Sequence, residues 1–242
     1  MAEQNQGIPR RTRDAYRTLA ERMTSIHISR FSELPRIELY LDQLLSLVDE
    51  ELSFMRLPDE GPLVTGSMVN NYVKRHVVPA PVKHRYTRRH VCYVVCVCLF
   101  KRVLSIEQVT RLIRHVEEEN LDLRHTYDEL CAALECALAE QFAVGPDFVA
   151  PAVEPVIDLR DVNGEKVDSP LDRTIEAAVV SLAAKIYVEQ ILALGDAEVA
   201  QVPAAAGAAS DAATPAPAAP EAVTPAPADP ASLVSPAVTT VK

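Results

Sequence analysis

Apolar residues recur at intervals of three and four along most of this chain, and strict alternation of apolar and polar residues is scarce. This period gathers apolar side chains on one face of a helix, whereas a half-buried strand needs a period of two. The fold class that follows is all-α. Helices are expected at residues 13–28, from just after Pro35 to about 52, at 67–78, at 88–103, after Ser105, after Thr126 and from Ser169–Pro170 to about Gly195.

The run Val91–Phe100 is apolar on every side and rich in β-branched residues, so its pattern alone is equally compatible with a buried strand. Thr87 has the position of an N-cap in front of it, and Ser105 with Gln108 forms a capping-box spacing behind it. These bracketing caps, together with the lack of a partner strand nearby, favour a buried helix on which the others pack. Thr126 and Glu129 have the spacing of a further capping box.

Charge divides the chain unevenly. The formal net charge is -10, yet residues 65–116 hold ten basic residues and one acid, which leaves +9, while residues 116–195 hold seventeen acids and five bases, which leaves -12. From about Ala197 the sequence is mostly Ala, Pro, Thr and Val, which bury too little area to offset ordering. We therefore divide the chain into a basic N-terminal helix or arm (1–34), a basic domain (35–116), an acidic helical region for dimerisation or effector response (117–195) and a disordered tail (196–242).

A cationic stretch inside an acidic protein indicates a polyanionic partner, and nucleic acid is the first to test. The expected helix after Thr65 turns Val69, Tyr72 and Val73 inward and leaves Asn70, Asn71, Lys74 and Arg75 outward. Asn can read adenine edges, and Lys and Arg neutralise phosphates. An ordinary solvated surface helix explains the same pattern, and the helix by itself does not separate the two.

Arg88 and Arg89 favour the nucleic-acid interpretation, because the N-terminus of a helix is positive and usually attracts acids. Two arginines there suggest an outside anion. Lys101 and Arg102 lie at the other end of that helix, where the dipole alone accounts for them. At the start of the chain, Arg10, Arg11, Arg13 and Arg17 form either an arm that reaches a neighbouring groove or a solvated terminus.

The motifs SMVNNYVKRHVVPAP, KHRYTRRHVCYV and LSIEQVTRLI resemble the DNA-binding domain of MerR-type regulators over about 50 residues. By register, Val69 matches the leucine of the Leu-Arg-Tyr-Tyr core, Asn70 its arginine, and Asn71 with Tyr72 its tyrosines. Pro79 matches the first proline of the turn, Tyr86 and Thr87 the cap after the wing, and Ser105-Ile106-Glu107 the last motif. The chain departs from the family at Asn70 and at Lys83 and His84, which replace an arginine and the Tyr-Arg of the wing. The resemblance implies a winged helix-turn-helix.

The chain is also similar to a bacterial family known as domain of unknown function 1836, through LYLDQLL at 39–45, MVNNYVK at 68–74 and the KxxYxRxH pattern at 83–90. This similarity covers about 35–116, extends toward Phe142, and implies a DNA-binding regulator. A homodimer is expected. MerR proteins dimerise through one long helix after this domain, whereas residues 120–124 and 145–155 interrupt the C-terminal half here, so the sequence leaves the geometry of the dimer open.

Other classes receive less support. No phosphate loop, zinc-protease motif or nucleophile elbow is present, so an enzyme is disfavoured and no cofactor is expected. Cys92, Cys96, Cys98, Cys131 and Cys136 lack a Cys-x-x-Cys pair, and we interpret them as packing residues, with no metal site. No export signal is evident, and the longest apolar run, Val91–Phe100, is too short to span a bilayer, so a cytoplasmic protein without membrane contact is expected.

The resulting hypothesis is a transcriptional regulator that binds double-stranded DNA, with an effector that the sequence does not name. Asn70, Asn71 and Tyr72 are expected to face bases. The remaining expected DNA-binding residues are Ser67, Lys74, Arg75, Lys83, His84, Arg85, Arg88 and Arg89. The alternative is a non-enzymatic adaptor that docks an acidic protein through the same basic face.

Overall fold

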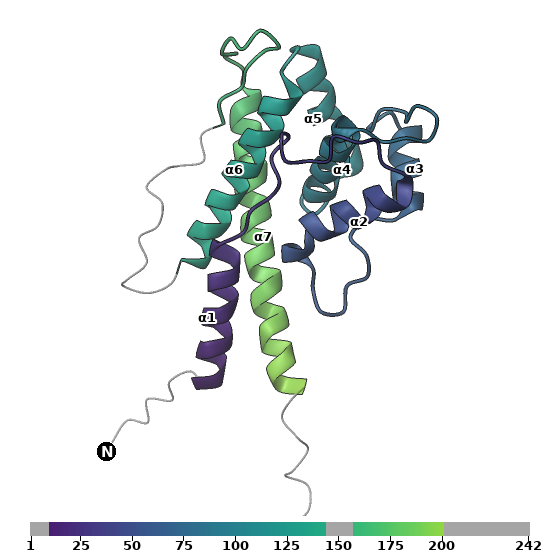
Figure 1. Cartoon of the computed structure of the whole chain (residues 1–242). Helices are drawn as coiled ribbons and strands as arrows, with labels where there is room; N and C mark the ends of the chain where they lie inside the picture. Colours follow the sequence, from purple (N-terminus) through teal and green to yellow (C-terminus); the bar gives the residue numbers. More distant parts are fainter. Residues whose placement is uncertain (1–9, 144–156, 201–242) are drawn as a thin grey trace, which may run out of the picture. The chain divides into compact units, whose positions relative to one another are not determined.

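The computed structural model describes residues 10–143 and 157–200. In the described residues the regular elements are helical, which confirms the all-α class, and only isolated β-bridges join extended segments. The elements are α1 (Arg10–Thr24), α2 (Leu41–Glu51), the short 3-10 helix η1 (Ser53–Met55), α3 (Gly66–Lys74), α4 (Arg88–Phe100), α5 (Ile106–Glu118), α6 (Leu123–Phe142) and α7 (Leu171–Ala200) (Figure 1).

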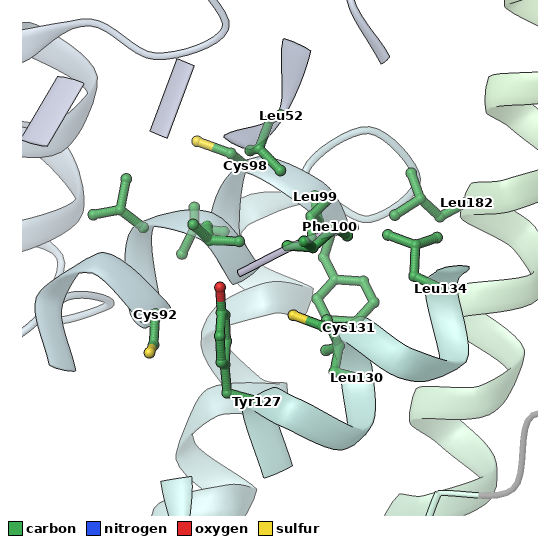
Figure 2. Close-up of a cluster of buried hydrophobic side chains, with 14 of the residues drawn as sticks. Leu52, Cys92, Cys98, Leu99, Phe100, Tyr127, Leu130, Cys131, Leu134 and Leu182 are labelled. Carbon is green, nitrogen blue, oxygen red and sulfur yellow. The ribbon is translucent and has the colours of Figure 1, made fainter. Parts of the chain in front are cut away.

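α4 is the central helix of the core. It contacts α2, α5, α6 and α7, and all its residues from His90 to Phe100 except Cys96 are buried. Figure 2 shows Cys92, Leu99 and Phe100 of α4 together with Tyr127 and Leu130 of α6. The helix predicted for Val91–Phe100 is therefore confirmed, and its uniform apolarity reflects partners on every side.

α6 packs along α7, and α1 lies against both (Figure 1). The predicted stripe of α7 is buried as expected: Leu171, Ile175, Val179, Leu182 and Ile186 are all at most 6% exposed. These residues recur at three- and four-residue steps, so they share one side of the helix. The acidic C-terminal region and the first helix thus form one packed layer.

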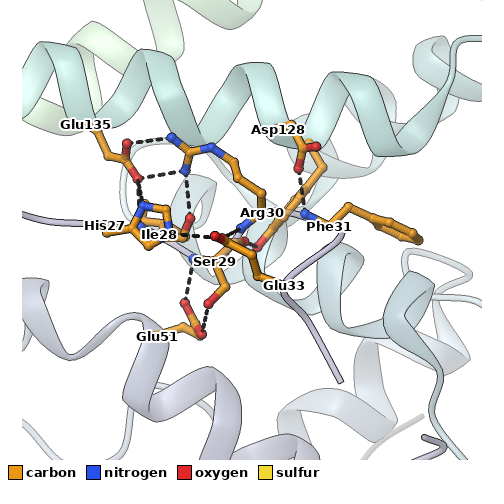
Figure 3. A network of polar contacts seen from close by, with 10 residues as sticks. His27, Ile28, Ser29, Arg30, Phe31, Glu33, Glu51, Asp128 and Glu135 are labelled. Carbon is orange, nitrogen blue, oxygen red and sulfur yellow. Dashed lines mark hydrogen bonds and ion pairs between the residues drawn. The ribbon is translucent and has the colours of Figure 1, made fainter. Parts of the chain in front are cut away.

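The segment between α1 and α2 is held by a polar network that joins it to α6 and α2 (Figure 3). The Arg30 guanidinium donates to both carboxylate oxygens of Glu135, at 2.7 and 2.6 Å, and the N–H of Ile28 donates to Glu135 at 2.7 Å. Ser29 donates through its N–H and its hydroxyl to Glu51 at 2.9 and 2.6 Å. The hydrogen bond and charge of Glu135 raise the pKa of Arg30, so the guanidinium stays charged.

The helix expected just after Pro35 begins later, at Leu41. Leu39 is extended, and it exchanges two backbone hydrogen bonds with Tyr86, at 2.8 and 2.9 Å. This pairing removes the Leu39 N–H and carbonyl from any helical ladder. The first turn of α2 is instead completed by the Gln43 side chain, which accepts from the N–H of Tyr40 at 2.9 Å.

The capping box predicted at Thr126 is also wrong. Thr126 is buried inside α6, and Asp122 caps the helix by accepting from the N–H of Arg124 at 3.0 Å. The N–H of Asp122 donates to the carbonyl of Arg160 at 2.8 Å. This contact with a distant segment fixes the start of α6.

Two helix boundaries at the ends of the described chain differ from the prediction. α1 ends at Thr24, and Ile28, although fully buried, follows it in irregular structure. α7 passes Gly195 and continues to Ala200, into the region predicted as tail. The loop predicted at 145–155 lies outside the described residues, as does the tail from 201 onward.

α7 contains a longer apolar segment than Val91–Phe100, which the sequence indicated as the longest. Leu171–Gly195 is long and apolar enough to cross a bilayer by length and composition, with a mean hydropathy of 1.6. Glu176, Lys185 and Glu189 lie within this segment, so it does not stand out in the sequence as an uninterrupted apolar run. A core helix passes the same test, and one side of α7 is packed on α6, although only 33% of the apolar window is buried.

Candidate nucleic-acid interface

α3 presents a polar face to solvent because its apolar residues face the core. The Thr65 hydroxyl accepts from the N–H of Met68 at 3.3 Å and caps the helix. Val69 is fully buried, whereas Asn70, Asn71 and Lys74 are exposed. Within the described chain no hydrogen bond or ion pair occupies these three side chains. They are free to contact a ligand.

Tyr72 belongs to the buried side of α3, which corrects the prediction that it faces bases. Its side chain is 5% exposed, and burial raises its pKa to about 12. A ring in this position supports the helix from below and cannot enter a groove of DNA. Ser67 is exposed near the start of α3, with its hydroxyl oxygen 3.0 Å from that of Thr65.

α3 ends at Lys74, before the predicted boundary at Pro79, in a turn with a left-handed residue. His76 has φ 57°. The N–H of Val77 donates to the carbonyl of Tyr72 at 2.9 Å and that of His76 to Val73 at 3.0 Å, which is the Schellman pattern. Glycine usually occupies this position, so the sequence did not signal the turn. His76 is exposed beside Lys74 and is a candidate contact that the sequence reasoning missed.

The segment between α3 and α4 forms a minimal hairpin at the place where a wing was expected. Val82 and Arg85 form an antiparallel bridge, and the N–H of Arg85 donates to the carbonyl of Val82 at 2.9 Å. The two central residues, Lys83 and His84, have φ 48° and 58°, as in a type I′ turn. Left-handed backbone at non-glycine residues costs free energy and is often retained at functional positions. Both side chains are exposed at the tip.

Arg85 is occupied within the protein. Its guanidinium carbon lies 3.5 Å from the centroid of the Tyr40 ring, and it donates to the Tyr40 hydroxyl. Tyr86, the next residue, is buried and carries the bridge to Leu39. The base of the hairpin is therefore fixed to the residues that start α2, and the tip with Lys83 and His84 projects from a stable support.

α4 begins where predicted. The N–H of Thr87 donates to Nδ1 of His90 at 3.0 Å, and the Thr87 hydroxyl lies 2.9 Å from the same nitrogen. His90 is 7% exposed, and burial lowers its pKa, so the neutral acceptor form is favoured. This cap fixes the directions in which Arg88 and Arg89 leave the helix.

Arg88 and Arg89 have partners inside the protein, so they do not require an outside anion. Arg88 donates from Nε to the carbonyl of Pro35 at 3.2 Å and lies over the ring of Phe31. Arg89 donates to the Tyr93 hydroxyl at 3.2 Å, and that hydroxyl donates to Glu117 at 2.8 Å. Arg89 remains exposed and can still reach a phosphate.

The other basic residues of the stretch 65–116 also divide into those with partners inside the protein and those without. Arg75 pairs with Glu107 at 2.9 Å, Arg102 pairs with Glu60 and Glu189, and Lys101 donates to the Leu63 carbonyl at 2.8 Å. Four exposed basic residues of the stretch 65–116 make no ion pair or hydrogen bond to the described chain: Lys74, Lys83, Arg111 and Arg114. These four, together with the exposed Arg89, are the basic residues of this stretch that a partner can contact.

Three of the five cysteines lie in the core, and Cys96 packs against it. Cys92, Cys98 and Cys131 are buried, and burial raises the pKa of the Cys98 thiol to about 11 and of Cys96 to about 12. Metal ligation needs the thiolate, which these surroundings disfavour. Among the described residues no group of three His, Cys, Asp or Glu side chains is placed to hold a metal ion.

The site thus belongs to an all-α domain that exposes Asn70, Asn71 and Lys74 on a short helix next to a basic hairpin. Residues 29–130 match the family described as Domain of unknown function (DUF1836). The motifs quoted from the sequence predicted this match. Comparison with curated proteins and with solved structures gave no match.

Proposed function

We propose that this protein binds double-stranded DNA as a transcriptional regulator, with α3 as the reading helix. The observation that carries the proposal is the exposed, unoccupied face of Asn70, Asn71 and Lys74 on a capped helix, followed by a hairpin that exposes Lys83 and His84. Asn side chains can form two hydrogen bonds with adenine in the major groove, and lysines neutralise phosphates.

In this proposal Ser67, Lys74, Lys83 and Arg89 contact the DNA backbone, and His76 and His84 lie at its edge. We propose a MerR-like order in which α3 is the reading helix, the hairpin is the small wing and α4 is the following helix. It departs from a simple helix-turn-helix because residues 52–65, including η1, separate α2 from α3, where three or four residues are usual.

The protein is proposed to act as a homodimer, since two copies can read the two halves of a symmetric site. The outer side of α7 supports this proposal. Val180, Val188 and Leu192 are 43%, 52% and 64% exposed, and apolar side chains repeated on one helix side are typical of an interface.

A second candidate is an adaptor that docks an acidic protein. It is favoured by three exposed apolar residues near the hairpin base, Ile37 (70%), Tyr40 (50%) and Val82 (71%). Phosphate contacts need no such residues, whereas protein interfaces are rich in them.

Fluorescence anisotropy with duplex genomic fragments at several salt concentrations tests the first proposal. Lys74→Ala and Lys83→Ala should each reduce the slope of log affinity against log salt by about one. Asn71→Ala should reduce the preference for the selected site with little change in slope. Lys166→Ala, an exposed lysine in the acidic region, is the matched control and should leave both quantities unchanged. Binding without any selective site, or slopes unaffected by Lys74→Ala and Lys83→Ala, would favour the adaptor.

A further inference from the structure

A hollow of about 510 Å³ opens where α1, the residues after α2 and the C-terminal part of α7 meet. Leu19 and Arg22 come from α1, Arg56 and Leu57 follow η1, and Gln190 and Leu194 belong to α7. Its volume is in the range of small-molecule sites. It lies away from α3 and the hairpin, so the proposed DNA contacts do not use it.

The polar part of the hollow is built on Gln190, which is 6% exposed. Its side-chain nitrogen donates to the carbonyls of Phe54 and Arg56, at 3.5 and 3.2 Å, and its oxygen accepts from Arg22 at 3.3 Å. These three hydrogen bonds join α1, η1 and α7 and hold the Arg22 side chain beside the opening. Because its nitrogen and its oxygen both have partners, the buried Gln190 amide is held in one orientation and keeps Arg22 in place.

The two arginines of the hollow have unused hydrogen-bonding capacity. Arg22 makes no ion pair with the described residues. Arg56 pairs with Asp49 through Nη2, but its Nε is buried and has no partner in the described structure. Because Nε of Arg56 is closed off from the hollow, it is not a donor for a ligand there; Nη1 of Arg56 and the Nε and Nη1 atoms of Arg22 make no hydrogen bond to the described residues and remain available.

We propose that this hollow is a binding site for a small organic carboxylate with an apolar body. The two guanidinium groups supply the positive charge, and the described residues that line the hollow include no acidic side chain. Guanidinium groups bind carboxylates through paired hydrogen bonds. Leu19, Leu57, Pro58, Ala193 and Leu194 form an apolar wall that an inorganic anion would leave uncovered.

A ligand bound in the hollow would also change the contacts that hold the segment before α3. The Asp49 carboxylate that holds Arg56 accepts from the N–H of Leu63 at 3.1 Å, two residues before the Thr65 cap. A carboxylate bound at Arg56 would compete with Asp49 and change how this segment is held. This consequence for DNA rests on the proposed function, whereas the binding site itself does not.

Titration calorimetry of the full chain with octanoate, octanol and inorganic phosphate tests the site in the absence of DNA. Octanoate should bind, and octanol and phosphate should each bind at least about tenfold more weakly, because each lacks one of the two recognised parts. Equal binding of octanol or of phosphate, or no binding of octanoate, would overturn the proposal.

Two variants place the binding in the hollow. Arg22→Gln, at an exposed position, should weaken octanoate binding about tenfold, and Ala193→Phe should fill the wall and abolish it. Arg173→Gln, on an exposed part of the same helix α7, is the control and should bind as the unmodified chain does. Unchanged affinity in Arg22→Gln would exclude this location even if Ala193→Phe fails to fold.

Anisotropy with DNA, with and without octanoate, tests the coupling separately. A protein that binds octanoate but no DNA would retain the site and lose only the proposed function.

Discussion

The Arg30–Glu135 pair shows that the effect of an ion pair on stability depends on how far its two side chains are buried. The two side chains are 24% and 19% exposed, and Glu135 also accepts from the N–H of Ile28. Removing one partner from such a pair leaves the other poorly solvated, which costs more than the pair contributes. By contrast, Arg75 and Glu107 are 47% and 66% exposed, and water can replace either partner.

Arg30→Ala should therefore lower the free energy of unfolding by about 2–3 kcal/mol. The matched control Arg75→Ala should change it by less than about 0.5 kcal/mol. Urea unfolding followed by circular dichroism measures both. Recovery of most of the loss in the double variant Arg30→Met with Glu135→Leu would show that the unpaired carboxylate is the cause, and an Arg30→Ala protein as stable as the control would contradict the argument.

The residues of the candidate site could be predicted from the sequence only in part. Asn70, Asn71 and Lys74 follow from the helical period, because Val69 and Tyr72 fix which side is buried. That same period should have excluded Tyr72 from the base contacts. Arg75 and Arg85 could not be recognised as occupied, because their partners Glu107 and Tyr40 are distant in the sequence and become neighbours only in the fold.

At the level of elements, α3 begins with a glycine, although the backbone at this position does not need one and alanine would favour the helix more. Gly66 is the first helical residue, and a Cβ added there would lie 3.4 Å from Cδ2 of Leu41, an ordinary contact. Gly164, in contrast, has φ 85°, a backbone conformation that residues other than glycine rarely adopt, although the space around it is open.

Gly66→Ala should accordingly stabilise the protein by about 0.5 kcal/mol, because alanine reduces the freedom of the unfolded chain. Gly164→Ala should destabilise it by about 1 kcal/mol, because its backbone is left-handed. Melting temperatures of the two variants, measured together with the unmodified chain, give the signs. A loss of stability in Gly66→Ala would show that Leu41 cannot yield the space.

The helices themselves were predicted best where their start is encoded locally. Thr87 and Ser105 cap α4 and α5 as expected, because each cap and its partner lie within one turn. Asp122 was missed as the cap of α6 because a hydrogen bond to Arg160 fixes it in place. Leu39 was assigned to a helix for the same reason, since its pairing with Tyr86 cannot be read from local sequence.

For the whole molecule, charge and apolar surface are separated between regions. Residues 65–116 carry a formal charge of +9 and contain four exposed basic side chains without a partner among the described residues, whereas residues 116–195, with α6 and α7, carry -12. α7 has a fully buried side, yet only 33% of its apolar window is buried among the described residues. In the proposed homodimer, a second copy would cover the exposed side of α7 without bringing the basic surfaces of the two protomers together.

Val188→Glu should therefore convert a dimer into a monomer, because it places a charge in the middle of the exposed side of α7. The dissociation constant of the dimer is expected to rise at least about tenfold. Sedimentation velocity at several protein concentrations measures it, and circular dichroism verifies that the helices persist. Val162→Glu, the same change at a residue of similar exposure outside α7, is the control and should leave the dimer intact. If the unmodified chain sediments as a monomer at all concentrations, or if both variants dissociate equally, α7 is not the dimer interface.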